Sequence, residues 1–317
     1  MEKMVNNIIS VIVPVYNVEA WVFEAIGSVV RQSNIDDYVV ELIIVDDCSK
    51  DKTVGEIKKA ISENKSNVEI RLLENIENLK ICKTLNKAYK ISNGSYILRL
   101  DGDDIALPNR FSTQLNYLQQ HNLDLVGCQM IAIDEDGNEL SKGNMPVGVD
   151  KVRAACQFAS PIAHIWLAKR EVYEALGGYR EIPYAEDYDF ILRALDKGFR
   201  CDNTPEHLML IRQRAGNTAS TASLKQRKTH KYVLELHQRR MNSNSDDDGF
   251  SEAELAKRIS SWPLTERLHA ISTQLMTSAY HEKNVLRKLF KVLSACLLSY
   301  YNFEYLVSRI RFKKSFM

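Results

Sequence analysis

The sequence lacks an excess of charge of either sign and lacks an apolar run long enough to cross a membrane. Its 317 residues include 42 Lys and Arg against 41 Asp and Glu, which leaves a formal net charge of +1. A protein that binds along a nucleic acid needs a basic surface to neutralise phosphates, so we expect no nucleic-acid partner. A membrane-spanning helix needs about 20 mainly apolar residues, and the longest such stretch late in the chain, residues 292–303, is shorter. These absences predict a cytoplasmic protein.

Patterns that mark several other protein classes are also missing. The six cysteines are scattered without a CxxC pair or a zinc-type grouping with histidine, so we expect reduced thiols in the core rather than a zinc site. No GxGxxG motif and no P-loop motif occurs, which argues against dinucleotide-dependent oxidoreductases and P-loop ATPases. With 7 Pro, 13 Gly and 45% hydrophobic residues, the composition excludes collagen-like chains and predicts a globular protein.

Short β-branched runs alternate with helical patterns through the first half of the chain. Residues 8–13 and 41–45 are near-continuous apolar runs, the pattern of strands covered on both faces. Further strands are expected at residues 68–73 and 96–100, and helices at 19–31, from Thr53, at 79–91 and after Pro108. Strands that alternate with helices in this way predict an α/β domain with a mainly parallel sheet.

The pattern changes after residue 124. A strand at 125–133, a hairpin turn at 136–138 and less regular segments before a helix at 186–195 indicate that the sheet becomes mixed. Residues 242–251 are polar and acidic, which predicts a loop or linker, and the residues beyond them are helical in type. We therefore expect one α/β domain over residues 1–220 and a helical region over residues 221–317.

Two acidic clusters follow strands of this predicted sheet. Asp46 and Asp47 come directly after the strand at 41–45, and residues 101–104 (Asp-Gly-Asp-Asp) follow the strand at 96–100. Ligands of open α/β sheets gather beyond the carboxyl ends of the strands, so both clusters are expected at one edge. Crowded carboxylates raise each other's pKa unless a cation is present, and an Asp-x-Asp suits a hard divalent ion that bridges phosphates. The alternative is that these aspartates only cap loops and helices.

Three stretches carry a resemblance to a known family: residues 11–17 (VIVPVYN), 44–53 (IVDDCSKDKT) and 93–104 (NGSYILRLDGDD). Their order and spacing resemble the family 2 glycosyltransferases of the GT-A fold, over roughly residues 8–215. The resemblance implies a Rossmann-like mixed sheet, with a nucleotide-binding half at about residues 1–105 and an acceptor half at about 106–220. It also implies an enzyme that moves a sugar from a nucleoside diphosphate to an acceptor, with inversion at the anomeric carbon.

The same resemblance implies a donor site at the first two strand ends. Tyr16 matches the residue that packs on the donor base, and Pro14 adds a backbone contact. Asp47 matches the carboxylate that accepts the uracil N3–H. These matches imply a UDP-sugar donor.

A metal site is implied at the third strand end. Asp101 and Asp103, on either side of Gly102, match the Asp-x-Asp of the family. Asp103 corresponds to the ligand of a Mn²⁺ or Mg²⁺ ion on the diphosphate, and Asp101 to a residue that contacts the ribose or the metal with its water shell. Such an ion neutralises charge that develops on the departing UDP. Asp104 is an additional acid whose place could be with the acceptor or the metal.

A further acidic pair resembles the catalytic motif of the family. Residues 177–180 (GGYR) and 185–190 (AEDYDF) match the stretch that ends in a Glu-Asp pair. The match makes Asp187 the general base that takes the proton of the acceptor hydroxyl, with Glu186 beside it as the substitute. The alternative is that both acids complement the dipole at a helix N-terminus.

Three more residues are candidates for donor binding. His164 matches a histidine often found before the acceptor-side strand, although a buried structural histidine is an equal alternative. Arg214 stands near the place of a late histidine in many relatives; an arginine does not ligate a metal but can bind diphosphate. Where relatives often have Ala-Arg-Asn, this chain has Thr-Leu-Asn at 84–86, which leaves Lys80 or Lys83 as substitutes.

The end of the chain is basic and amphipathic. From residue 283 onward Lys and Arg outnumber the acids and alternate with apolar residues, as in helices that lie on anionic membranes. The alternative is that the apolar stripe packs on the catalytic domain. Relatives of this length commonly build O-antigen or other surface polysaccharide. This implies a sugar acceptor on polyprenyl diphosphate and peripheral contact with the inner face of the plasma membrane.

These observations predict a metal-dependent hexosyltransferase that uses a UDP-sugar, with glucose or galactose favoured. One alternative is an aspartate-based phosphoryl-transfer enzyme, because its sites also place Asp-x-Asp after an apolar strand; binding of nucleoside diphosphates discriminates between the two. Another alternative is a protein that binds UDP-sugar without turnover. The presence of Asp47, Asp103 and Asp187 together argues against it.

Overall fold

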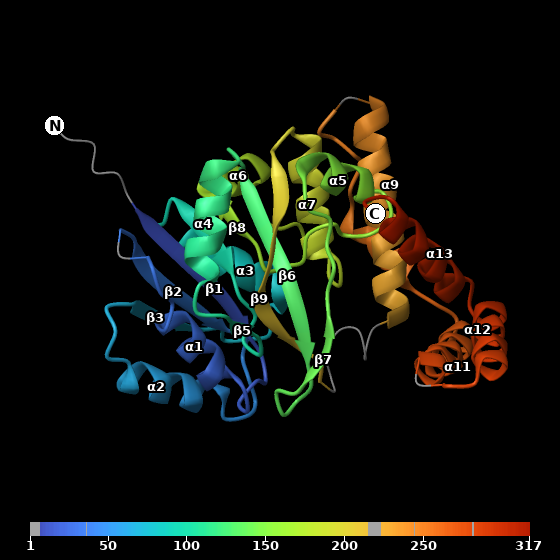
Figure 1. Ribbon diagram of the computed structural model, residues 1–317, viewed down its shortest axis with the longest axis horizontal. Helices are drawn as coiled ribbons and strands as arrows, with labels where there is room; N and C mark the ends of the chain where they lie inside the picture. The colour runs from blue at the N-terminus through green and yellow to red at the C-terminus, as the bar shows by residue number, and fades with distance from the viewer. Residues whose placement is uncertain (1–6, 36, 215–222, 244, 281) are drawn as a thin grey trace.

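One mixed sheet forms the centre of the molecule, with helices on both faces and further helices at the C-terminal end (Figure 1). The computed structural model describes residues 7–35, 37–214, 223–243, 245–280 and 282–317. The strands are β1 (Ile8–Val15), β2 (Val39–Asp46), β3 (Glu69–Glu74), β4 (Tyr96–Arg99), β5 (Ile105–Ala106), β6 (Leu125–Ile133), β7 (Glu139–Lys142), β8 (Leu167–Lys169) and β9 (Cys201–Arg212). The helices are α1 (Val22–Val30), α2 (Thr53–Glu63), α3 (Lys80–Lys90), α4 (Arg110–Gln120), α5 (Val149–Ala155), α6 (Arg170–Leu176), α7 (Glu186–Asp196), α9 (Ser223–Ser243), α10 (Glu252–Ile259), α11 (Pro263–Tyr280), α12 (Val285–Leu298) and α13 (Tyr300–Lys314).

The sheet is parallel in its first half and mixed in its second. The strand order is β3-β2-β1-β4-β8-β6-β9-β5, with β7 beside β6. Parallel pairing joins β1 to β2 and β4, and β2 to β3. In the second half β6 and β9 are parallel, whereas β8 is antiparallel to both β4 and β6. The predicted α/β architecture, with a sheet that becomes mixed after residue 124, is confirmed.

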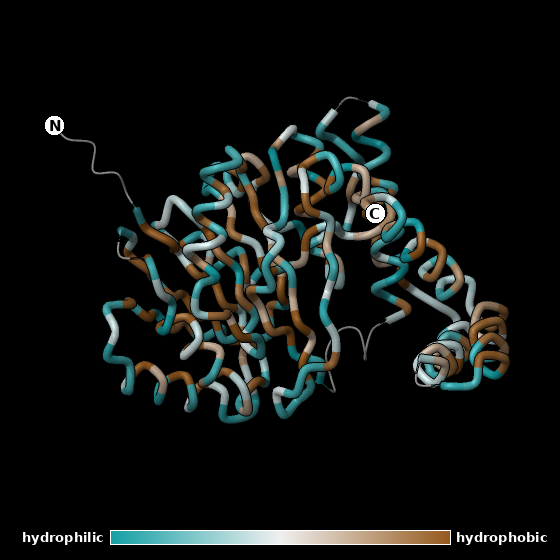
Figure 2. The backbone as a smooth tube through the Cα atoms, in the orientation of Figure 1, coloured by the Kyte–Doolittle hydropathy of each residue, from teal (hydrophilic) through white to brown (hydrophobic). Residues whose placement is uncertain are grey.

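Two apolar layers cover the two faces of the sheet, and β1 contributes to both. Successive side chains of a strand point to opposite faces, so Val11 and Val13 pack in the layer under α1, α2 and α4. Ile12, between them, packs in the layer under α3, α7 and α9. All three side chains are at most 1% exposed. The hydrophobic run that the sequence predicted at residues 8–13 is therefore one of the buried strands, and Figure 2 shows hydrophobic residues in brown along the strands of the sheet.

The cysteines only partly follow the expectation of core thiols. Four of the six are buried, but Cys48 and Cys296 are partly exposed. Cys48 follows the end of β2, where the chain turns with a positive φ of 63°. Its thiol lies beyond the strand end, near the Ile76 carbonyl (3.6 Å) and Lys50 Nζ (3.1 Å).

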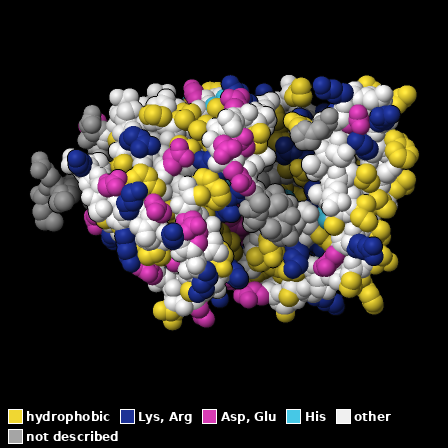
Figure 3. Space-filling view, turned by 90° about the horizontal axis from the view of Figure 1, so that it is seen from below, with side chains coloured by type: hydrophobic (Ala, Val, Ile, Leu, Met, Phe, Trp, Pro, Cys, Tyr) yellow, Lys and Arg dark blue, Asp and Glu magenta, His cyan; other side chains and the backbone are white. Residues whose placement is uncertain are grey.

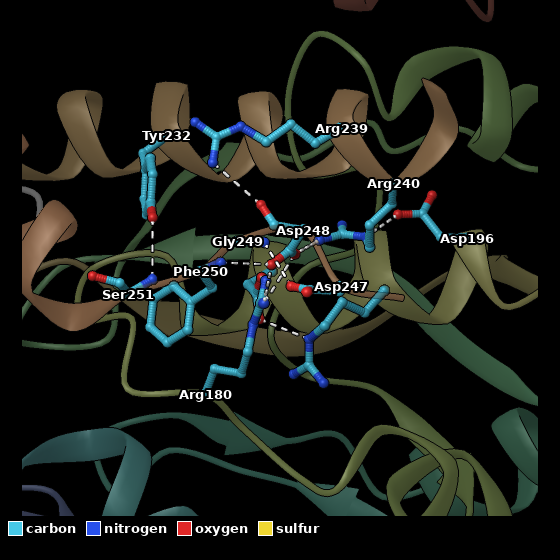
Figure 4. Close-up of polar contacts among 12 residues, drawn as sticks. Arg180, Asp196, Tyr232, Arg239, Arg240, Asp247, Asp248, Gly249, Phe250 and Ser251 are labelled. Atoms are coloured by element: carbon cyan, nitrogen blue, oxygen red, sulfur yellow. Dashed lines mark hydrogen bonds and ion pairs between the residues drawn. The ribbon is translucent and has the colours of Figure 1, made fainter. Parts of the chain in front are cut away.

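The acidic stretch predicted as a loop at residues 242–251 carries one buried carboxylate. It connects α9 to α10, but Asp248 is only 4% exposed. Its carboxylate accepts hydrogen bonds from Arg180 Nη1 (2.9 Å) and from Arg240 (Figure 4). Arg180 belongs to the loop before α7, so one aspartate joins the α/β part to the helical part. The predicted boundary at residues 220 and 221 lies outside the described residues.

The basic tail divides into two kinds of surface. At the end of α13, Phe312 and Phe316 are buried against Met145 and Ala155, as the packing alternative expected. By contrast, α12 leaves most of its apolar side chains exposed. Among the described helices, none has both the length and the hydrophobicity needed to span a bilayer.

Candidate functional site

A cavity of about 350 Å³ opens at the carboxyl ends of β1, β2 and β4. We call it the strand-end pocket. Seven of the residues predicted from the sequence line it: Pro14, Tyr16, Asp47, Asp101, Gly102, Asp103 and Arg214. They meet because parallel strands β1, β2 and β4 end at the same edge of the sheet. The sheet thus assembles in one place residues that lie up to two hundred positions apart in the chain.

Asp47 shapes one wall of the strand-end pocket. Its carboxylate is 5% exposed and accepts hydrogen bonds from the backbone N–H groups of Leu79 (2.7 Å) and Lys80 (2.9 Å) and from Asn75 Nδ2 (2.9 Å). Lys80, the first residue of α3, has a strained positive φ of 70° that these bonds hold. Because each carboxylate oxygen accepts two hydrogen bonds, Oδ2 retains room for one further donor in the pocket.

Arg99 connects the strand-end pocket to the start of α7. Its Nε donates to Asp101 Oδ1 (3.0 Å) and its Nη2 to Glu186 Oε1 (3.1 Å). Burial alone would raise the pKa of Asp101, but Arg99 and His164 together outweigh burial and hold that pKa below its usual range. Burial wins at Glu186, whose pKa is raised in spite of Arg99. The sequence analysis missed Arg99, although an arginine inside an apolar strand was the available signal.

Asp101, Asp104 and His164 form the cluster best suited to a metal ion among the described residues. His164 Nε2 lies 3.5 Å from Oδ2 of Asp101 and 3.5 Å from Oδ2 of Asp104. Burial raises the pKa of Asp104 to about 6. Burial lowers the pKa of His164, but the two carboxylates outweigh it and raise that pKa to about 9. Two carboxylates and an imidazole, with ligand atoms within 4.8 Å of one another, are a donor set that suits Mn²⁺.

Asp103 forms an ion pair with an arginine that also lines the strand-end pocket. Its Oδ2 accepts a hydrogen bond from Arg214 Nε at 2.6 Å, and both side chains are 17% exposed. Arg214 also lies over the ring of Trp21, 5.1 Å from its centroid. The structure therefore brings Asp101 together with Asp104 and His164, and leaves Asp103 in an ion pair. Arg214 therefore places a guanidinium group in the wall of the strand-end pocket.

A second buried arginine binds the backbone on which the cluster residues are carried. Arg110 is 0% exposed and donates to the backbone carbonyls of Arg99 and Ile165, at 2.9 Å each. Burial lowers its pKa to about 10, opposed in part by the charges of Asp104 and Asp101. No sequence pattern predicted this role, because arginine is also a common residue in exposed helices.

Four predicted site residues do not line the strand-end pocket: Lys83, His164, Glu186 and Asp187. Lys83 is exposed on α3, where its charge acts on Glu181, and Lys80 lines the pocket in its place. Asp187 is half-buried in the first turn of α7 and accepts a hydrogen bond from the backbone N–H of Tyr188 (2.7 Å). Its neighbour Glu186 is bonded to Arg99, which in turn contacts Asp101 of the pocket wall.

The chain is similar to proteins of one known family. The family described as Glycosyl transferase family 2 matches residues 10–177. The O-antigen biosynthesis glycosyltransferase WbnJ of Escherichia coli is 31% identical over 225 residues, 70% of this chain and 86% of that protein. Two crystal structures share the fold: S. aureus TarS 1-349 in complex with UDP-GlcNAc (18% identity, TM-score 0.58, 95% and 91% of the two chains), and the mannosyltransferase PcManGT from Pyrobaculum calidifontis with GDP-Man and Mn²⁺ (17%, 0.58, 97% and 85%). The predicted GT-A fold is confirmed.

Proposed function

The chain belongs to glycosyl transferase family 2, and we propose that it moves a hexose, glucose or galactose, from a UDP-sugar to a sugar acceptor with inversion. The observation that carries this proposal is the convergence of Tyr16, Asp47, Asp101 and Arg214 on the strand-end pocket. An aromatic ring, a hydrogen-bond acceptor and a guanidinium match the base, the ring nitrogen and the diphosphate of the donor. The phosphoryl-transfer alternative provides no use for Tyr16 or Asp47.

The donor would lie with its base against Tyr16 and its diphosphate near Arg214. Tyr16 is 44% exposed and free to stack on a uracil ring. The remaining acceptor capacity of Asp47 Oδ2 suits the uracil N3–H. Solved structures of the same fold contain UDP-GlcNAc in one case and GDP-Man in another, which supports a nucleotide-sugar donor.

A divalent ion would be held by Asp101, Asp104 and His164, whose ligand atoms already face one another. When bound, such an ion neutralises negative charge on the leaving diphosphate. A ligand set with an imidazole favours Mn²⁺, because Mg²⁺ prefers oxygen ligands alone. Asp103 could join only after its ion pair with Arg214 opens.

Asp187 would act as the general base. In an inverting transfer, the acceptor hydroxyl loses its proton as its oxygen attacks the anomeric carbon from the face opposite the diphosphate. Glu186 is 8% exposed and bonded to Arg99, whereas Asp187 is half-buried and bonded to a backbone N–H. Of the two carboxylates, Asp187 is the one that an acceptor hydroxyl can approach.

Calorimetric titration of the purified protein with UDP, GDP and dTDP, each with Mn²⁺ and with chelator, tests the donor and the metal together. We expect UDP to bind best and to bind at least about tenfold more tightly with Mn²⁺, which corresponds to about 1.4 kcal/mol. Asp104→Asn is expected to remove most of this metal effect. The matched variant Asp103→Asn tests the metal ligand predicted from the sequence. A larger loss of the Mn²⁺ effect in Asp103→Asn than in Asp104→Asn would support that prediction. If the folded protein bound none of the nucleotides, phosphoryl transfer would become the better proposal.

We also propose that α12 rests on an anionic membrane, near a polyprenyl-diphosphate-linked acceptor. Leu286, Phe290, Leu293 and Leu297 follow one face of the helix and are 78, 72, 63 and 89% exposed. From residue 283 to the end the chain carries eight Lys and Arg but only one Glu. Figure 3 shows hydrophobic side chains along the edge formed by the C-terminal helices, with Lys and Arg among them. An apolar stripe bordered by cations is the pattern of interfacial helices. The O-antigen role of WbnJ agrees with this location.

Two acidic substitutions on the exposed apolar face of α12 should weaken this membrane contact. We expect the double variant Phe290→Asp/Leu293→Asp to lower binding to phosphatidylglycerol vesicles by more than about tenfold, because each buried apolar side chain contributes about 1.5–3 kcal/mol. Vesicle flotation measures the effect. Val39→Asp is the control, because Val39 is 60% exposed at the start of β2. Equal binding by the double variant and the control would remove the membrane from the proposal.

A further inference from the structure

A second and larger cavity, of about 520 Å³, lies between α9 and α13, which run side by side in Figure 1. We call it the α9–α13 groove. It shares no lining residue with the strand-end pocket. Its wall on the α13 side is largely aromatic, with Tyr300, Tyr301, Phe303 and Tyr305. Such a wall offers ring faces and hydroxyl groups, the surfaces on which proteins commonly hold sugars.

The groove carries uncompensated positive charge. Three of its lining residues are Arg227, Lys231 and Arg311, and Glu304 is its one carboxylate. Lys231 Nζ pairs with Glu304 at 2.9 Å. Among the described residues neither arginine has an acidic partner, and Arg227 Nε is buried without a hydrogen-bond acceptor. The Arg227 guanidinium lies 3.7 Å from the centroid of the Tyr305 ring, which fixes its position. Two arginines and no free carboxylate are suited to a phosphate group.

Part of the groove wall comes from the residue that follows the proposed catalytic base. Tyr188 and His230 both line the groove, and their ring centroids are 5.3 Å apart. Asp187 directly precedes Tyr188 in α7, and its charge acts on His230. A molecule in the groove would therefore lie against Tyr188, the residue that follows the proposed base.

The other side of the groove continues into the exposed apolar surface. Tyr300 and Phe303 are 58% and 48% exposed, and α13 follows α12 after the single residue Ser299. A ligand that fits both surfaces has an anionic head in the groove and an apolar tail along α12. That combination excludes a free sugar and a free phosphate as the best occupant.

We propose that the α9–α13 groove is the acceptor site, which binds the phosphate and the first sugar of a lipid-linked acceptor. Arg227 and Arg311 hold the phosphate oxygens, and the tyrosines of α13 lie against the sugar. This inference rests on the proposed glycosyltransferase function, because it gives that reaction its second substrate. It assigns a role to the helical region, which contributes no residue to the strand-end pocket.

Titration calorimetry with farnesyl diphosphate, in chelator and without nucleotide, tests the groove directly. We expect binding that saturating UDP with Mn²⁺ does not displace, and much weaker binding of inorganic diphosphate. Arg311→Gln should weaken farnesyl diphosphate about tenfold, the loss of one charge-assisted hydrogen bond. Arg227→Gln should give a similar loss. Arg309→Gln is the matched control, because Arg309 lies on the same helix but does not line the groove.

Each other outcome overturns the inference. Equal losses in Arg309→Gln and Arg311→Gln would indicate general attraction to a basic helix. Displacement by UDP would place farnesyl diphosphate in the strand-end pocket. Equal binding of inorganic diphosphate would show that the apolar tail contributes nothing to binding, which excludes a lipid-linked ligand. Binding of UDP with Mn²⁺ is measured on the same variants. Its retention shows that they are folded and separates a failure of the groove from a failure of the donor site.

Discussion

Asp187→Asn is expected to lower the rate of sugar transfer by about 10²–10⁴-fold, the contribution of a positioned general base, and to leave UDP binding unchanged. Asparagine keeps the shape of the side chain but cannot accept the proton of the acceptor hydroxyl. Asp187 is outside the lining of the strand-end pocket, so the substitution should not alter the affinity for UDP. Turnover is measured with UDP-hexose and acceptor, and UDP affinity by calorimetry.

A carboxylate at a helix start also complements the helix dipole, and a control has to separate that effect from catalysis. Glu252→Gln removes an exposed acid from the first turn of α10. It should change neither turnover nor UDP affinity. Wild-type turnover in Asp187→Asn would show that the base is another group. Glu186→Gln is a poorer test, because it also releases Arg99 from one of its two carboxylate partners.

Asp248→Asn is expected to lower the free energy of unfolding by about 3–5 kcal/mol, the cost of removing one partner from a buried ion pair. The Asp248 carboxylate is 3% exposed and faces Arg180 and Arg240, which are 20% and 5% exposed (Figure 4). Asparagine would leave these two guanidinium groups short of a countercharge. Arg180 is also bound to Asp189 of α7, so the loss would reach the helix that carries Asp187. Urea unfolding followed by circular dichroism measures the change.

The control for Asp248 lies in the same loop. Asp246 pairs with Lys197, but its side chain is 76% exposed. Exposed ion pairs contribute at most about 1 kcal/mol, so Asp246→Asn should leave the unfolding midpoint almost unchanged. Equal effects of the two substitutions would mean that the contacts of Asp248 do not hold the helical region to the α/β part.

The strands and the edge at which their acids gather were predictable from the sequence. The apolar runs at 8–13 and 41–45 became β1 and β2, each longer by a few residues than the predicted run. Side chains covered on both faces must be apolar throughout, so such strands are visible without knowledge of their partners. Asp47 and Asp101 lie within two residues of strand ends, and parallel pairing then puts them at one edge.

The partners of those acids were not predictable. Asp103 pairs with Arg214, 111 positions away, and Asp101 meets both Arg99 and His164. An ion pair depends on side-chain positions within a few ångströms, and sequence spacing does not fix those positions for residues on different elements. The acidic stretch at 242–251 shows the same limit, because only the fold brings Arg180 to Asp248.

The sequence by itself therefore determined the α/β fold and the family resemblance, because periodic burial and strand-end motifs are local properties of the chain. The tertiary structure alone decided which carboxylates share His164, which one pairs with Arg214 and which faces of α12 and α13 are covered. Those features arise where separate elements meet in space. Burial and electrostatic pairing are set there by distances that local sequence does not encode.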